Sequence, residues 1–156
     1  MLDIKITNAK TRKTGKELVE IGIENGKITA IAPSVEGEAK QVIDAKGKLV
    51  TESFVNGHLH LCKVYTLEMA GQDALKEYND NNMGGAMTSI ERAADFKACY
   101  DEKWIIENVR KACDLAVKYG NTHIRAFADV DSKARLEGVK GVIRGREEYK
   151  DRLDIQ

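Results

Sequence analysis

The segment Phe54–Cys62, whose sequence is FVNGHLHLC, decides the fold prediction for this chain. Successive side chains of a β-strand point to opposite faces, so a spacing of two residues places His58 and His60 on one side, close enough to hold one metal ion. The apolar residues that flank them indicate a buried strand, in which two imidazoles need partners to offset the loss of water. Two histidines on a strand can also simply share a polar surface, but a metal ion would satisfy both rings at once.

Cys62 continues the same alternation, so we expect it on the face of the strand that carries the two histidines. A thiolate is a competent zinc ligand, although a buried thiol near a metal ion as often contacts the ligands without binding the metal itself. Two histidines alone are too few, because a catalytic zinc site usually has three protein ligands and a water. The segment therefore predicts part of a metal site, with Cys62 as a candidate third ligand.

Composition excludes several classes of partner. The chain has 156 residues, and its 25 lysines and arginines balance its 25 aspartates and glutamates. Because neither sign is concentrated in a block, we expect no nucleic-acid partner and no anionic membrane partner. No apolar run is long enough to cross a membrane, and the N-terminus lacks the layout of a signal peptide. We therefore expect a cytoplasmic protein with a small-molecule partner.

The cysteines point to the same compartment. Their number is three, and none of them forms a Cys-x-x-Cys pair. An odd count with this spacing argues against a disulfide framework and against a zinc ribbon. Cys99 and Cys113 are expected to be small buried residues within helices.

Residues 1–52 are predicted to form a small antiparallel β unit. The dipeptide Asn25-Gly26 separates two runs of alternating apolar residues, which is the strongest short-range signal of a β-hairpin. The expected strands cover residues 2–7, 18–24, 27–32 and 41–44.

Residues 53–156 are predicted to alternate between strands and helices. Thr88 and Glu91 have the form of a capping box, which starts a helix toward Cys99, and Asp101 caps a longer helix that stops at Gly120. The polar stretch 79–85 is predicted to be a mobile loop that follows the histidine strand and acts as a lid. The remaining expected elements are a strand over 122–128, a helix over 134–149 weakened by three glycines, and a strand that begins at 153.

Strands that alternate with helices predict parallel βα units, whose sites lie at the carboxyl ends of the strands. Asp129 and Asp131 follow the strand over 122–128, so they are candidate substrate-binding residues. Aspartates in this position more often cap a helix or close a turn, and we favour that role. His123 and Arg125 lie within the strand itself, where we favour a structural role for both.

A β-rich start, a strand that ends in His-x-His, a long helix and a parallel strand resemble the amidohydrolase superfamily. The stretches 54–66, 85–93 and 120–132 are similar to its cytosine deaminase and N-isopropylammelide isopropylaminohydrolase branch. The resemblance implies an α/β fold in which a small β-sandwich subdomain precedes a metal-dependent (β/α)8 (TIM) barrel. Residues 1–52 would be part of the sandwich, and residues 53–156 would be the first βα units of a barrel that is incomplete at the C-terminus.

The resemblance also implies a chemistry. His58 and His60 match the metal ligands of the first barrel strand, which implies one divalent metal ion, zinc or iron. The activity implied is hydrolytic deamination of a small N-heterocycle such as cytosine or an s-triazine, by a homo-oligomeric enzyme. The other ligands, a histidine and an aspartate, and the acid/base glutamate are expected beyond Gln156, so the chain alone is expected to be inactive.

Two positions depart from the family pattern. The family often has aspartate where Cys62 stands, and a proline-glycine or proline-proline step where Glu52-Ser53 stands. Neither change removes a metal ligand, but both leave the substrate open. The alternatives are a cyclic amide hydrolase of the same superfamily and a non-catalytic, truncated fragment.

Overall fold

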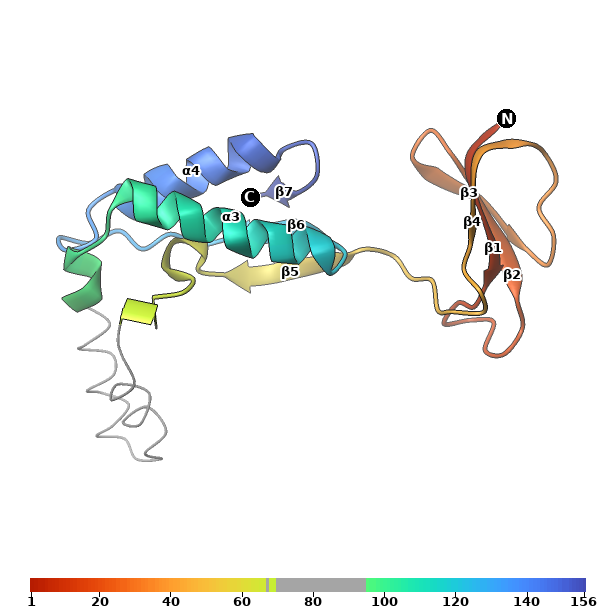
Figure 1. Cartoon of the computed structure of the whole chain (residues 1–156), viewed down its shortest axis with the longest axis horizontal. Helices are drawn as coiled ribbons and strands as arrows, with labels where there is room; N and C mark the ends of the chain where they lie inside the picture. Colours follow the sequence, from red (N-terminus) through yellow and green to blue (C-terminus); the bar gives the residue numbers. More distant parts are fainter. Residues whose placement is uncertain (67, 70–94) are drawn as a thin grey trace, which may run out of the picture. The chain divides into compact units, whose positions relative to one another are not determined.

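The computed structural model describes residues 1–66, 68–69 and 95–156. The chain divides into two compact units, Met1–Glu52 and Ser53–Gln156, and each unit has its own sheet (Figure 1). The predicted loop over 79–85 and the predicted helix start at Thr88 lie outside the described residues. Among the described helices, none is both long and apolar enough to cross a bilayer.

The first unit is a four-stranded sheet in the order β3-β2-β1-β4. The predicted hairpin is confirmed: β2 and β3 pair antiparallel, and Asn25 and Gly26 have φ angles of 51° and 71°. Two successive positive φ angles are the mark of a tight hairpin turn whose twist matches that of the strands. The strands are β1 (Leu2–Ala9), β2 (Val19–Glu24), β3 (Lys27–Ala32) and β4 (Ala39–Asp44).

This sheet is mixed, and the expectation of a purely antiparallel unit is wrong. β4 pairs with β1 in parallel, with Leu2 opposite Ala39 and Thr7 opposite Asp44. The reason is that β4 does not return beside β3, since the chain crosses to the far edge of the sheet before β4 begins. A strand reached by such a crossover is free to run parallel, whereas a strand joined by a two-residue turn is not.

The second unit has the predicted parallel βα order. β5 (Phe54–Leu59), β6 (Asn121–Ala126) and β7 (Asp154–Ile155) form a three-stranded sheet in sequence order, and both pairings are parallel. A short 3-10 helix, η1 (Leu61–Lys63), follows β5. α3 (Glu102–Lys118) precedes β6 and α4 (Glu137–Tyr149) precedes β7, and the two helices lie side by side (Figure 1).

Both predicted ends of α3 are confirmed. Oδ1 of Asp101 accepts hydrogen bonds from the backbone N–H groups of Lys103 (2.9 Å) and Trp104 (3.2 Å), which have no partner within the helix. At the other end, Gly120 has a φ angle of 81°, a left-handed conformation that a side chain would disfavour. β6 begins at Asn121, directly after Gly120, so α3 leads into the second strand without a further loop.

α4 begins three residues later than predicted, and its glycines serve packing. Residues 132–136 form turns, and the helix starts at Glu137. A Cβ atom added to Gly141 would overlap the side chain of Ile105, and one added to Gly145 would overlap that of Val109. The two helices therefore approach more closely than larger residues would permit.

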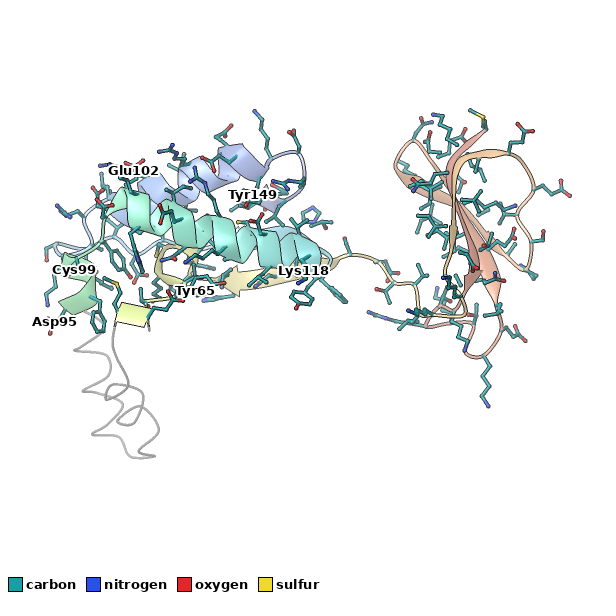
Figure 2. The ribbon with its side chains drawn as sticks, in the orientation of Figure 1. Tyr65, Asp95, Cys99, Glu102, Lys118 and Tyr149 are labelled. Carbon is teal, nitrogen blue, oxygen red and sulfur yellow. The ribbon has the colours of Figure 1, made fainter. Side chains whose placement is uncertain are left out.

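Polar contacts tie the far end of α4 to α3. The hydroxyl of Tyr149, labelled in Figure 2, donates to Oδ1 of Asp114 at 2.6 Å and contacts the carbonyl of Arg110 at 3.1 Å. Arg110 in turn donates two hydrogen bonds, both 2.7 Å long, to the carboxylate of Glu148. A bidentate pair of this kind fixes orientation as well as distance.

The core of the second unit lies between the sheet and the two helices. Its fully buried side chains include Ile124 of β6, Ile155 of β7, Leu61 of η1, and Ile105 and Val109 of α3. The other face of the sheet carries exposed residues, which include Val55 (67% exposed) and His123. β5 is therefore not the buried strand that we predicted, because the described helices cover only one of its faces.

Candidate metal centre

His58 and His60 lie together at the carboxyl end of β5. His58 is within the strand and His60 directly follows it, and their ring centroids are 5.2 Å apart. Two imidazoles bound to one tetrahedral zinc through bonds of about 2.0–2.1 Å would have centroids about 5 Å apart. The distance between the two rings is therefore of the size that a shared metal ion requires.

Phe127 packs against both imidazoles. Its ring stacks on that of His58 at a centroid distance of 4.3 Å and lies 5.5 Å from that of His60. Its backbone N–H donates to the carbonyl of Leu59 at 2.8 Å, which ties the end of β6 to the end of β5. Phe127 was not among the predicted site residues, and its only sequence signal is that it directly follows a strand parallel to the histidine strand.

Asp129 lies beside the pair and contacts three cationic or imidazole side chains. Its Oδ1 is 3.1 Å from Nδ1 of His60, and its Oδ2 accepts from Nζ of Lys63 (3.3 Å) and Nζ of Lys97 (3.0 Å). Burial opposes ionisation of this carboxylate, yet the hydrogen bond from Lys97 and the charge of Lys63 hold its pKa below the usual value. Asp129 is therefore a carboxylate at neutral pH, and it does not cap a helix as we had favoured.

Lys97 joins this group to the next carboxylate along the chain. Its ammonium lies 2.8 Å from Oδ2 of Asp131 as well as 3.0 Å from Asp129, and the two acceptors raise its pKa. Lys97 belongs to a helical turn between Asp95 and Cys99, which are labelled in Figure 2. No sequence pattern singled out this lysine, because its partners are more than thirty residues away.

Asp131 has the turn-closing role that we favoured. Its Oδ1 accepts from the backbone N–H groups of Lys133 (2.9 Å) and Ala134 (2.8 Å), just before α4. The hydrogen bond from Lys97, with the support of these N–H groups, lowers the pKa of Asp131 to about 2. The side chain of Asp131 thus contacts Lys97 and two backbone N–H groups.

Cys62 does not share a face with the histidines, and that expectation is wrong. The strand ends at Leu59 and the chain turns into η1, so the alternation stops before Cys62. Cys62 is 1% exposed, and its Sγ accepts the backbone N–H of Asp129 at 3.2 Å. Burial raises the pKa of this thiol. A ligand role for Cys62 stays a prediction, and within the described residues no group of three His, Cys, Asp or Glu side chains is arranged to hold a metal.

His123 lies apart from the pair, on the uncovered face of the sheet. Its Nδ1 is 2.8 Å from the hydroxyl of Thr122, and its Nε2 is 3.9 Å from Asp154. His123 and Arg125 line a hollow of about 370 Å³ on this face, together with Val55, Gly57, Ile124 and Gln156. The histidine pair does not line this hollow.

Comparison with known proteins gives the family. The model of the amidohydrolase family matches residues 41–153, which include β5, η1, α3, β6 and α4. The chain belongs to the amidohydrolase family. The α/β fold that we predicted is confirmed, and the two histidines lie within the matched part of this amidohydrolase chain.

Relatives of this amidohydrolase act on several substrates. The N-isopropylammelide isopropyl amidohydrolase of Pseudomonas sp. strain ADP is 32% identical over 154 residues, which are 99% of this chain and 37% of that enzyme. An allantoinase of Bacillus licheniformis is 32% identical over 102 residues, which are 63% of this chain and 22% of that enzyme. The matched part of the chain thus spans little more than a third of the first of these enzymes and about a fifth of the second.

A solved structure shows the same fold. The 5-methylcytosine deaminase of Klebsiella pneumoniae, with bound 5-fluorocytosine, superposes with a TM-score of 0.73 at 22% sequence identity. The match covers 97% of this amidohydrolase chain and 35% of that enzyme. At this level of identity the likeness concerns the arrangement of strands and helices.

Proposed function

We propose that His58 and His60 are two ligands of one divalent metal ion in an enzyme that hydrolyses carbon–nitrogen bonds other than peptide bonds. The observation that carries this proposal is the paired imidazoles, 5.2 Å apart, at the carboxyl end of a parallel strand in an amidohydrolase chain. Sites of parallel α/β folds lie at this end of the strands. The native ion would be zinc or iron, since both accept imidazole ligands.

The proposed architecture is the start of a (β/α)8 barrel. Residues 53–156 would supply its first βα units, and residues 1–52 would be part of a β-sandwich subdomain. The parallel order β5-β6-β7, with a helix before each of the last two strands, supports the barrel. The match to 35% of the length of a 5-methylcytosine deaminase supports it too.

The residues of the site have separate tasks. A bound divalent ion would supply a water of lowered pKa as the nucleophile. His58 and His60 would hold that ion from the end of β5, while the ring of Phe127 stacks on His58 and lies 5.5 Å from that of His60. The general acid that protonates the leaving nitrogen is not identifiable among the described residues, and we expect the 156 residues alone to show no turnover.

The proposed substrate class is a small nitrogen heterocycle that carries an exocyclic amine, such as cytosine or an s-triazine. The names of an N-isopropylammelide amidohydrolase and a 5-methylcytosine deaminase among the relatives support this class. We expect a homo-oligomer for the complete enzyme. Hydrolysis would release ammonia or an alkylamine and leave a carbonyl on the ring.

The test is amine release by the natural gene product. Ammonia from cytosine and isopropylamine from N-isopropylammelide are measured for the wild type, for His58→Asn and for His123→Asn as the matched control. We expect release by the wild type and by the control, and its loss in His58→Asn together with bound metal. Unchanged activity in His58→Asn would contradict the proposal.

Cyclic amide hydrolysis is the second candidate function. The observation in its favour is the allantoinase similarity over 102 residues. Ring opening would create a carboxylate and release no amine, so the two functions differ in their products. Acid production from allantoin without ammonia would favour this second function over deamination.

A further inference from the structure

We propose that Asp129 is a positioning residue for His60: it accepts the Nδ1–H of the imidazole, so that the Nε2 lone pair is the one presented to a metal ion. This inference rests on the proposed function, because His60 is taken as a ligand there. Neither the family match nor the relatives assign a role to Asp129.

The two carboxylate oxygens of Asp129 have different partners, and these partners give the direction of the hydrogen bond with His60. Oδ1 of Asp129 lies 3.1 Å from Nδ1 of His60, whereas Oδ2 takes Lys63 and Lys97 at 3.3 and 3.0 Å. An ionised carboxylate can only accept, so the ring nitrogen that faces it must carry the hydrogen. A neutral imidazole has one N–H, and Nε2 is then the free acceptor for a metal.

The rest of the loop holds Asp129 in this position. Its backbone N–H donates to Sγ of Cys62 at 3.2 Å, and its side chain is only 13% exposed. Cys62 is itself fixed beneath α4, since a Cβ atom added to Gly138 would lie 2.9 Å from Cβ of Cys62. Cys62 therefore contributes to the site through the loop that carries Asp129.

The same contacts argue against substrate binding by this carboxylate. Both oxygens of Asp129 are already engaged, one by an imidazole and one by two ammonium groups. Asp131 provides a natural control, because it shares Lys97 with Asp129 but its other partners are backbone N–H groups. A variant at Asp131 changes the charge around Lys97 and leaves the acceptor of His60 in place.

The experiment is nitrogen-15 NMR of the histidine rings in the purified chain, at a pH where a free imidazole is neutral. We expect wild-type His60 to carry its hydrogen on Nδ1. In Asp129→Ala the hydrogen moves to Nε2 in a large fraction of molecules, and in Asp131→Ala it stays on Nδ1. Zinc added to the wild type shifts Nε2 of His60, and its affinity falls about 10- to 100-fold in Asp129→Ala but not in Asp131→Ala.

The outcomes separate the inference from the proposed function. A wild-type His60 with its hydrogen on Nε2 would overturn the inference, and this measurement needs no variant. Zinc binding at His60 together with that tautomer would leave the metal site standing without the positioning role. An Nδ1 hydrogen that depends on Asp129, in a chain on which zinc has no effect, would support the hydrogen bond and refute the metal site.

Discussion

Nδ1 of His60 lies 3.1 Å from Oδ1 of Asp129, although the two residues are 69 positions apart in the chain. This contact exists because β5 and β6 are parallel neighbours, so the residues that follow each strand meet at one edge of the sheet. It joins the histidine pair to a carboxylate and two lysines.

The cysteines should differ sharply in reactivity. Cys62 and Cys113 are buried and Cys99 is exposed, contrary to our expectation that Cys99 would be buried. The pKa of Cys62 and that of Cys113 are raised, mainly by burial, so few thiolates are available to react. In the native chain we expect a thiol reagent to label Cys99 quickly and the other two only on unfolding, as read by intact-mass spectrometry.

The same labelling tests the ligand role that was considered for Cys62. Because its Sγ accepts from the backbone of Asp129, zinc should change the labelling rate of Cys62 no more than that of Cys113. Cys113 is the control, because it is as deeply buried in the second unit as Cys62. Protection of Cys62 alone on addition of zinc would show that it is a ligand after all.

Removal of the aromatic ring at Phe127 should weaken metal binding without loss of the fold. An aromatic stack of this kind contributes about 0.5–1.5 kcal/mol, which corresponds to roughly a 2- to 10-fold decrease in zinc affinity in Phe127→Ala. Phe54→Ala is the matched control, since Phe54 is also an exposed aromatic residue of this sheet. Equal zinc affinity in both variants would show that the stack on His58 has no role.

The pairing of Lys97 with Asp131 should make stability depend on pH in the acid range. The hydrogen bond from Lys97 lowers the pKa of Asp131 from 3.8 to about 2, so the folded state binds this proton less readily than the unfolded state. The stabilisation is thus complete above pH 3.8 and is lost as the pH falls toward 2. The Tm of Asp131→Asn should lie below that of the wild type at neutral pH, and the gap should close over this window.

Lys97→Met provides the check on that prediction. It removes this ion pair and also the pair of Lys97 with Asp129, so its Tm should lie at or below that of Asp131→Asn at neutral pH, and its difference from the wild type should narrow as both carboxylates take up protons in acid. The double variant should be little less stable than Lys97→Met alone, because Asp131 has already lost its lysine partner in that variant. A Tm difference that is constant from neutral pH to pH 2 would contradict the assignment of the low pKa to this pair.

A methyl group at Gly141 should destabilise the second unit. The added Cβ would overlap Ile105, so the helices must separate, at a cost of about 1–3 kcal/mol in the free energy of unfolding. The gain in helix propensity of about 1 kcal/mol offsets only part of this. Urea unfolding of Gly141→Ala measures the change, with Arg146→Ala, at an exposed position of α4, expected within about 0.5 kcal/mol of the wild type.

Turn and capping residues, which act over a few positions of the chain, made much of the fold predictable. Asn25-Gly26 required a hairpin, Asp101 a helix start and Gly120 a helix stop, and each effect acts within a few residues. The alternation of strands and helices then gave the parallel order of the second unit. The histidine pair followed from a spacing of two residues.

Contacts between distant segments could not be predicted. Phe127 and Asp129 join the site through the register of β5 and β6, and Lys97 joins it from the helical turn at residues 95–98; no local pattern contains these contacts. Cys62 was misplaced because the strand ends at Leu59, and alternation by itself does not show where a strand stops. The parallel pairing of β4 was missed for the same reason, since it depends on a crossover.

The most direct test of the central claim is a zinc titration of the purified chain, followed by the NMR signals of its three histidines. His58 and His60 should shift together and saturate at one zinc ion per chain, while His123, on the uncovered face of the sheet, should not move. Equal shifts at all three histidines, or no shift at His58 and His60 in millimolar zinc, would contradict a metal site at this pair.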